Sequence, residues 1–259
     1  TAGMTYAKEL HVNYSYTGTT ENGAPFTPFK TLQAAVNAAP TIAVIYLHHS
    51  GTASETVTIS SANNLFIQGV AGHPDSPQFL LTGRIIINGT STRVRLKDMQ
   101  IVAPDANPAI TIDGSQGRHN FERVTTTGGT GLTITGSFQN WLELNDCAID
   151  GPISLGGTPA SGSSVTSYGL RAAAASFTMS HANYTAQLLD TKGLASITHS
   201  AGNLIINDFI GIGTSGITST CNFGSGVFMM GNASMLTPSF TMATLNKSGT
   251  CLYMLSNVV

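Results

Sequence analysis

The feature that most constrains the fold is a repeat of about 23 residues that begins near Thr56. Three successive segments, 83–102, 109–128 and 131–151, each contain a short β-branched strand, a polar turn, a second strand and another turn. The residues just after the second strand fall at intervals of 25, 23, 22, 22, 18, 24 and 25, and they are Asp98, Arg123, Asp146, Tyr168, Asp190, Asp208, Asn232 and Asn257. A repeat of this length with two or three strands is typical of one turn of a parallel β-helix, whose coils stack about 4.8 Å apart.

An antiparallel β-sandwich is the alternative fold for a chain with so many short strands. A sandwich predicts tight two-residue hairpins and regular alternation of apolar and polar residues, and neither is regular in this sequence. We therefore predict an all-β protein in which residues 56–259 form a parallel β-helix solenoid of about eight coils.

The segment before the repeats has the pattern of a short amphipathic helix. Between Thr27 and Ala39, apolar side chains stand at Phe29, Leu32, Val36 and Ala39. Pro28 occupies the first helical position and Pro40 follows the end. An open solenoid end exposes apolar interior and unpaired strand edges. We therefore predict that residues 1–55 form an N-terminal strand and a capping helix.

Four motifs near the N-terminus carry a family resemblance. They are Leu10-His-Val-Asn, Thr17-Gly-Thr-Thr-Glu-Asn-Gly, Pro28-Phe-Lys-Thr-Leu-Gln-Ala-Ala-Val-Asn-Ala-Ala and Asn64-Leu-Phe-Ile-Gln-Gly. Together they resemble the opening of right-handed parallel β-helix proteins of the pectin-lyase-like superfamily, in particular phage tail fibres and tailspikes. The motifs cover roughly residues 8–70, and the remainder agrees by coil periodicity. The superfamily includes polysaccharide lyases, glycosidases and attachment proteins, so the resemblance implies a right-handed solenoid but does not choose among these activities.

Composition excludes several classes of protein. The chain is 41% hydrophobic with a net charge of −2, which argues against disorder. Charged residues make up 9%, and the densest basic cluster is Arg93, Arg95 and Lys97, which is too small for a duplex nucleic-acid binder. No apolar run approaches the roughly 20 residues that span a bilayer, and residues 1–10 lack the order of a signal peptide. We expect neither nucleic-acid binding nor membrane insertion.

Motifs for metals and cofactors are weak in this sequence. Cys147, Cys221 and Cys251 lack the close spacing of a zinc site and are predicted to be core thiols. The glycines between Gly211 and Gly216 have dinucleotide-loop spacing, but a strand-like run follows instead of the required helix. We predict no metal and no cofactor.

Catalysis on this scaffold would require paired carboxylates in an outer groove. Asp146, Asp190 and Asp208 fall at corresponding turns and are the candidates if the protein is an enzyme, a glycoside hydrolase or polysaccharide lyase. One coil would separate Asp190 from Asp208, near the spacing of retaining glycosidases, and two coils would separate Asp146 from Asp190, nearer the inverting range. The structural interpretation is that each carboxylate hydrogen-bonds its own turn.

Carbohydrate recognition commonly uses an aromatic face beside planar polar groups. The richest such segment is 116–141, and its candidate receptor-binding residues are Arg118, His119, Arg123 and Trp141, which is the one tryptophan of the chain. The alternative is that Trp141 packs inward and the polar residues merely solvate an outer face.

The C-terminal segment suggests how the chain assembles. From Val227 onward the sequence is rich in methionine and aromatic residues, and Lys247 is its one charged residue. Core filling is the ordinary explanation. Fibre proteins of the resembled type are commonly homotrimers, so some of these side chains are predicted to face a partner.

The favoured hypothesis is a homotrimeric tail-fibre or tailspike-like protein, assembled in the host cytoplasm and located in the virion tail. It would contact other tail proteins and bind a bacterial surface polysaccharide or another envelope receptor. The alternatives are a polysaccharide-degrading tailspike and a bacterial β-helical adhesin.

Overall fold

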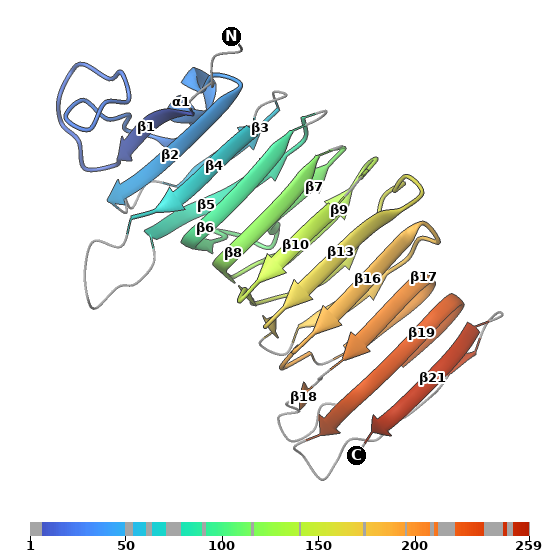
Figure 1. The fold of residues 1–259 in the computed structure, drawn as a ribbon. Coiled ribbons are helices and arrows are strands. Elements are labelled where there is room, and N and C mark those ends of the chain that lie inside the picture. The colour runs from blue at the N-terminus through green and yellow to red at the C-terminus, as the bar shows by residue number, and fades with distance from the viewer. Residues whose placement is uncertain are drawn as a thin grey trace.

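The computed structural model describes residues 7–49, 54–60, 64–70, 79–89, 92–114, 117–139, 141–172, 175–194, 196–207, 210–211, 221–235, 246–247 and 251–258, with side chains described as far as residue 207. Within these ranges the neighbouring strands pair in parallel and form one sheet wound into a parallel β-solenoid. The coils are stacked from β1 at one end to β21 at the other (Figure 1). The predicted fold class is confirmed.

The strands are distributed over three faces. Face A contains β1 (Lys8–Asn13), β2 (Ile42–His49), β4 (Asn64–Gly69), the first parts of β6 (Arg93–Val102) and β8 (Arg118–Thr127), β10 (Trp141–Asn145), β13 (Ser163–Tyr168), β16 (Tyr184–Leu189), the end of β17 (Ser196–Asn207), most of β19 (Cys221–Met235) and β21 (Cys251–Val258). Face B contains the start of β5 (Phe79–Ile87), the ends of β6 and β8, β11 (Ala148–Ile149), β14 (Arg171–Ala172) and β18 (Ile210–Gly211) with the end of β19.

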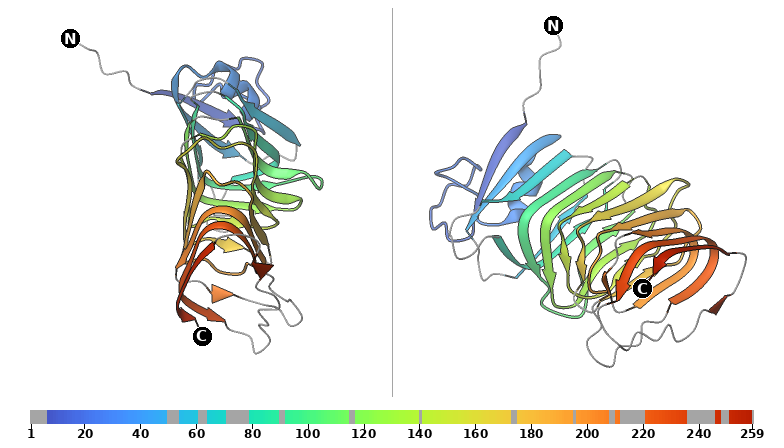
Figure 2. Two further views of the ribbon diagram at one scale, coloured as in Figure 1. Left: turned by 90° about the vertical axis from the view of Figure 1, so that its right-hand side faces the viewer. Right: turned by 60° about the horizontal axis from the view of Figure 1, so that its bottom comes forward.

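Face C completes each turn. It contains β3 (Glu55–Ile59), the end of β5, β7 (Pro108–Asp113), β9 (Thr130–Thr135), β12 (Ile153–Leu155), β15 (Ser176–Met179), the starts of β17 and β19, and β20 (Asn246–Lys247). Figure 2 shows the same order of coils from two further directions. The parallel ladder starts at β1 and β2, so it already runs through the segment 1–55 that the sequence assigned to the cap.

The strand register agrees with the repeat, but the number of turns does not. Trp141 pairs with Arg118 on one side and with Ser164 on the other, each 23 residues away. The number of turns differs slightly from the predicted eight. Asn232 and Asn257, counted as turn residues, lie inside the continuous strands β19 and β21.

Aliphatic side chains fill the interior in columns along the solenoid axis. On face A, one column of buried and strand-paired residues consists of Ile45, Ile67, Leu96, Phe121 and Leu144. On face C, another consists of Ile59, Ile87, Ile112, Ile134 and Leu155. Burial of each such side chain contributes about 1.5–3 kcal/mol. Because every second residue points inward, the residues between them are displayed in matching rows on the outer surface.

The predicted helix is present in the N-terminal segment, although it is shorter than expected. Helix α1 (Leu32–Ala38) begins after the N-cap Thr31, whose side chain accepts a hydrogen bond from the Ala34 amide. Phe29 is extended because its backbone amide and carbonyl bond to β1, which delays the start of the helix. The side-chain amide of Gln33 bonds to both the N–H and the C=O of Thr58, so α1 covers the outer edge of β3.

A recurrent corner links face A to face B. Asp98, Arg123, Asp146 and Asp190 occupy this corner with φ values of 54°, 50°, 50° and 49°. Short polar side chains tolerate the left-handed conformation better than most residues, which accounts for the three aspartates. The repeat predicted Tyr168 at this corner, which is wrong by one residue. Gly169, with φ of 68°, takes the corner, because Tyr168 pairs with Asn145 at the end of β10.

None of the described helical segments is long and apolar enough to cross a membrane.

Candidate functional site

A shallow groove of about 350 Å³ lies on the outer surface of face A, over the beginnings of β2, β4, β6 and β8. Its main lining side chains are Ile42, Val44, Phe66, Arg93, Arg95 and Arg118. The register brings them together in two adjacent outward rows. Ile42, Asn64 and Arg93 form one row, and Val44, Phe66 and Arg95 form the next. The groove therefore combines an apolar floor with a rim of arginines.

Phe66 and Arg95 form one fixed pair in this groove. The guanidinium carbon of Arg95 lies 4.9 Å from the centre of the Phe66 ring. Its Nη2 also donates a hydrogen bond to Glu122 Oε2 at 2.8 Å. Arg95 is thus held by an aromatic ring on one coil and by a carboxylate on another.

Arg118 and Trp141 form a second pair at the edge of the groove. They are directly opposite each other on β8 and β10, with the guanidinium carbon 5.7 Å from the ring centre. The Trp141 residue is 36% exposed, so the tryptophan faces outward and the alternative of an inward-packed tryptophan is wrong. The indole ring is available to a ligand at the surface.

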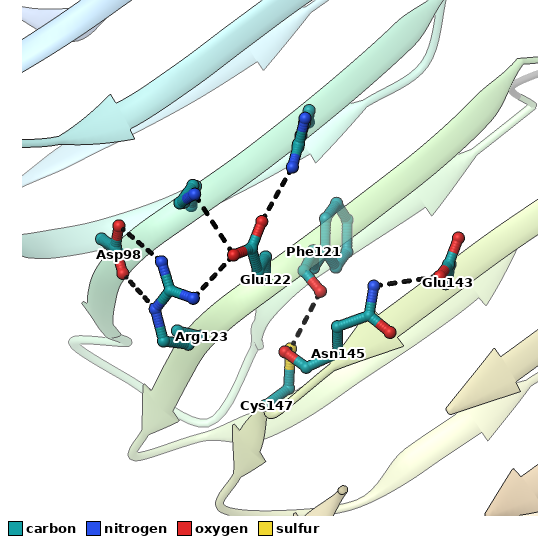
Figure 3. Close-up of polar contacts among 9 residues, drawn as sticks. Asp98, Phe121, Glu122, Arg123, Glu143, Asn145 and Cys147 are labelled. Carbon is teal, nitrogen blue, oxygen red and sulfur yellow. Dashed lines mark hydrogen bonds and ion pairs between the residues drawn. The ribbon is translucent and has the colours of Figure 1, made fainter. Parts of the chain in front are cut away.

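Most of the nearby cations are neutralised by acids. Glu122 accepts hydrogen bonds or ion pairs from Arg95, from Lys97 at 3.2 Å and from Arg123 at 2.6 Å. Arg123 also binds Asp98 through two hydrogen bonds of 2.6 and 3.0 Å (Figure 3). Burial opposes ionisation of Glu122, but hydrogen bonds from Arg95 and Lys97 outweigh it and lower its pKa.

Two arginines of the groove differ from these. Arg93 and Arg118 are exposed, and neither forms an ion pair within the described part of the chain. Val94 is level with His119, so the residues that precede them, Arg93 and Arg118, lie beside each other on the neighbouring strands β6 and β8. The groove therefore has local positive charge beside its apolar floor.

His119 does not belong to the outer surface, and its prediction as a receptor-binding residue is wrong. The side chain points into the solenoid and the residue is 2% exposed. Its Nδ1 accepts a hydrogen bond from the Val94 amide at 3.3 Å. Burial lowers its pKa to about 4, so the imidazole is neutral at physiological pH. The inward position follows from strand alternation, since its neighbours Arg118 and Asn120 point outward.

Arg123 lies in the middle of β8, at the corner where the strand passes from face A to face B. Its hydrogen bonds to Asp98, aided by the nearby charge of Glu122, hold the pKa of the guanidinium above its usual value. The expected single patch of four residues is therefore divided. Arg118 and Trp141 lie together at the surface, Arg123 lies at the corner between faces A and B, and His119 is buried in the solenoid interior.

The candidate catalytic aspartates lie away from the groove. Asp146 and Asp190 are exposed at the A–B corner, two coils apart, with Gly169 level between them. Asp190 forms an ion pair with Lys192 at 3.6 Å. Asp208 lies outside the described residues. Among the residues that the structure describes, no group of three or more His, Cys, Asp or Glu side chains is positioned to hold a metal ion.

The sequence did not single out Phe66, Arg93 and Arg95, which line the groove. The alternation of Arg93, Arg95 and Lys97 is visible in the sequence, but by itself it indicates only a basic cluster too small for duplex nucleic acid. Phe66 pairs with Arg95 across 29 residues, which exceeds the 23-residue repeat. Only the strand register shows that this longer coil places the ring under the guanidinium.

No protein family model matches this chain, and no curated protein is significantly similar to it. The function is therefore inferred from the fold and from the groove on face A.

Proposed function

We propose that this protein is the receptor-binding shaft of a phage tail fibre or tailspike, and that the groove on face A binds a bacterial surface polysaccharide. The observation that carries the proposal is the placement of Phe66 and Trp141 at the surface, each beside an arginine. Sugar rings pack their C–H faces on aromatic rings, and their hydroxyls hydrogen-bond to planar polar groups. Asn64 and Asn120 line the same groove and supply amide groups for these hydroxyls.

The scaffold suits attachment to a repetitive surface. Parallel pairing fixes the outer rows of side chains coil by coil, so the aromatic and cationic groups are already ordered before a ligand binds. A site that is ordered in advance loses less conformational entropy on binding. A polysaccharide extended along the solenoid axis would cross successive coils and contact one row after another.

The binding proposal is tested with Trp141→Ala and a matched control, Tyr168→Ala. Tyr168 is 46% exposed on face A but lies two coils beyond the end of the groove lining. Loss of a hot-spot aromatic costs about 2 kcal/mol, or roughly 30-fold in affinity. Trp141→Ala should weaken attachment to bacterial cells by this amount, and Tyr168→Ala should leave attachment unchanged. Equal attachment by both variants and the wild type would refute the groove as the receptor site.

We also propose that the shaft is a homotrimer. The support is the sequence of the C-terminal segment, whose many methionine and aromatic residues exceed what a narrow coil interior needs. Light scattering of the purified chain at several concentrations measures the assembly directly. A mass of three chains that persists on dilution is expected, and a monomer at every concentration would rule the trimer out. Detection of the protein in purified phage particles would distinguish a tail protein from a bacterial adhesin.

A second function, cleavage of the polysaccharide, is favoured by one observation. Asp146 and Asp190 share a corner with no side chain at Gly169 between them, and two strand spacings of about 4.8 Å separate their backbones. The resulting separation is close to the upper end of the range of about 6.5–9.5 Å that separates the two carboxyl groups of inverting glycosidases. Incubation with capsular polysaccharide should then release oligosaccharides, and Asp146→Asn or Asp190→Asn should abolish the release. Unchanged release by both variants would remove these aspartates as the catalytic pair.

A further inference from the structure

We infer that the ligand of the groove is an acidic polysaccharide, and that a carboxylate of a uronic-acid type sugar binds between Arg93 and Arg118. This inference rests on the proposed function and goes further by naming the chemical class of the glycan. It is carried by the contrast between these two arginines and the other cations around the groove.

The cations at the groove divide by their partners. Arg95, Lys97 and Arg123 all reach Glu122, and Arg123 also reaches Asp98. These ion pairs tie neighbouring coils together and are explained by the structure of the solenoid itself. Arg93 and Arg118 have no such role, because within the described residues no carboxylate pairs with either one.

The register makes the position of these two arginines unfavourable without a ligand. They stand side by side on β6 and β8, since Val94 is level with His119. Neighbouring strands are about 4.8 Å apart, and like charges directly opposite each other destabilise a sheet. A carboxylate placed between them would remove this repulsion and would accept hydrogen bonds from both guanidinium groups.

The surroundings suit a sugar more than a small anion. Ile42 and Phe66 provide apolar surface on one side of the arginines, and Trp141 provides it on the other. The C–H faces of successive sugar rings would pack on these side chains, with the carboxylate between them. Arg118 is held in place by its contact with Trp141, so the cation and the stacking surface act together.

Acidic side chains limit how much negative charge the ligand can have. Glu143 lies in the row of Phe66 and Arg95, on β10, and Glu122 lies in the next row, level with Lys97. A nucleic acid, with a phosphate on every residue, would place charges against these carboxylates. A polysaccharide with a carboxylate on one sugar of each repeat would avoid them, which favours the acidic glycan.

The test compares acidic capsular polysaccharides that contain uronic acid with the same polysaccharides after chemical reduction of the carboxyl groups. Binding of the intact protein is measured by biolayer interferometry at low and high salt. The wild type should bind an acidic polysaccharide, and both reduction and high salt should weaken the binding at least about tenfold. A nucleic-acid oligomer, as a competitor, should not displace the polysaccharide.

The variants separate this inference from the proposed function. Arg93→Gln and Arg118→Gln should each weaken binding to the acidic form about tenfold, and each should weaken binding to the reduced form by a smaller factor. Arg171→Gln is the matched control, because Arg171 is an exposed arginine on face B and its loss changes the net charge equally. Thermal unfolding of each variant shows whether it remains folded.

Two outcomes would overturn the inference. Equal binding of the acidic and reduced forms, unaffected by Arg93→Gln, would refute the role of the carboxylate while the groove would still bind glycan. Failure of every acidic polysaccharide to bind would also refute it. The proposed function itself fails only if Trp141→Ala has no effect on attachment to cells.

Discussion

Arg118 and Trp141 lie directly opposite each other on neighbouring strands, with the guanidinium carbon 5.7 Å from the centre of the indole ring. An exposed cation–π contact of this kind contributes about 0.5–1 kcal/mol. That is enough to orient the two side chains, yet both stay at the surface. The pair is the feature of face A that most directly resembles a sugar-binding arrangement.

Trp141 should matter little for folding, in contrast to an aromatic residue of the core. We expect Trp141→Ala to lower the free energy of unfolding by about 1 kcal/mol, because the side chain packs on one surface only. Phe121 is fully buried between Leu96 and Leu144, so Phe121→Ala should lower the free energy of unfolding by about 3–5 kcal/mol. Denaturant unfolding of both variants measures the difference. Equal losses would mean that Trp141 is a structural residue.

Ser167 is a polar residue in an aliphatic column, and its replacement should stabilise the protein. Its hydroxyl is buried between Leu144 and Leu188 and has no hydrogen-bond partner among the described residues. Ser167→Ala removes this unsatisfied group and should raise the free energy of unfolding by about 1 kcal/mol. Ser163→Ala is the control. The Ser163 hydroxyl bonds to the carbonyls of Phe138 and Ala160, so that variant should lose about 1 kcal/mol. A loss in both variants would contradict the prediction.

Buried His119 should make the solenoid sensitive to acid. Burial lowers the pKa of His119 to about 4, below the unfolded value of 6.5. The contribution of neutral His119 to the free energy of unfolding is therefore fully present above pH 6.5. It is lost as the pH falls toward 4, because the unfolded chain takes up the proton first. At about 1.36 kcal/mol for each pKa unit, the loss approaches about 3 kcal/mol. Unfolding measured by urea at a series of pH values tests this.

The variant His119→Gln isolates that contribution. The amide oxygen of glutamine can accept the hydrogen bond from Val94, but the side chain does not titrate. Burial also lowers the pKa of His199, which acts with the same sign in both proteins. The difference between wild type and variant therefore reports His119 alone. Parallel pH profiles would show that His119 does not govern the loss.

Gly169 at the A–B corner should resist substitution. Its φ is 68°, and a Cβ there would lie 2.6 Å from Asp146 Oδ1. Gly162 has a similar φ of 84° but nothing within 4 Å of a Cβ. Gly162→Ala should lower the free energy of unfolding by about 1 kcal/mol through backbone strain alone. Gly169→Ala should lower it further, because its Cβ also meets Asp146. Thermal unfolding compares the two, and Asp146→Ala combined with Gly169→Ala should recover the excess. Equal costs for the two glycines would exclude the contact with Asp146.

The sequence by itself determined the parallel solenoid, a short helix near the N-terminus and most of the described corner residues. The repeat located Asp98, Asp146 and Asp190, because a short polar residue is favoured where the chain turns in the left-handed conformation, and it located Arg123 by spacing alone. The 23-residue repeat likewise indicated which strands pair, since Trp141 is level with residues 23 positions away on both sides. These features depend on local conformation and on a period, and both can be read along one chain.

Only the tertiary structure decided which outward side chains meet. The sequence placed His119 beside Arg118 at the receptor face, yet a strand directs consecutive residues to opposite sides, and His119 became part of the core. It gave no reason to associate Phe66 with Arg95, because their coil is longer than the repeat. A shift of one residue in strand register turns an outward side chain inward. A change in coil length changes which residue of the next coil lies beside it. The groove on face A therefore exists only once the register of every coil is fixed.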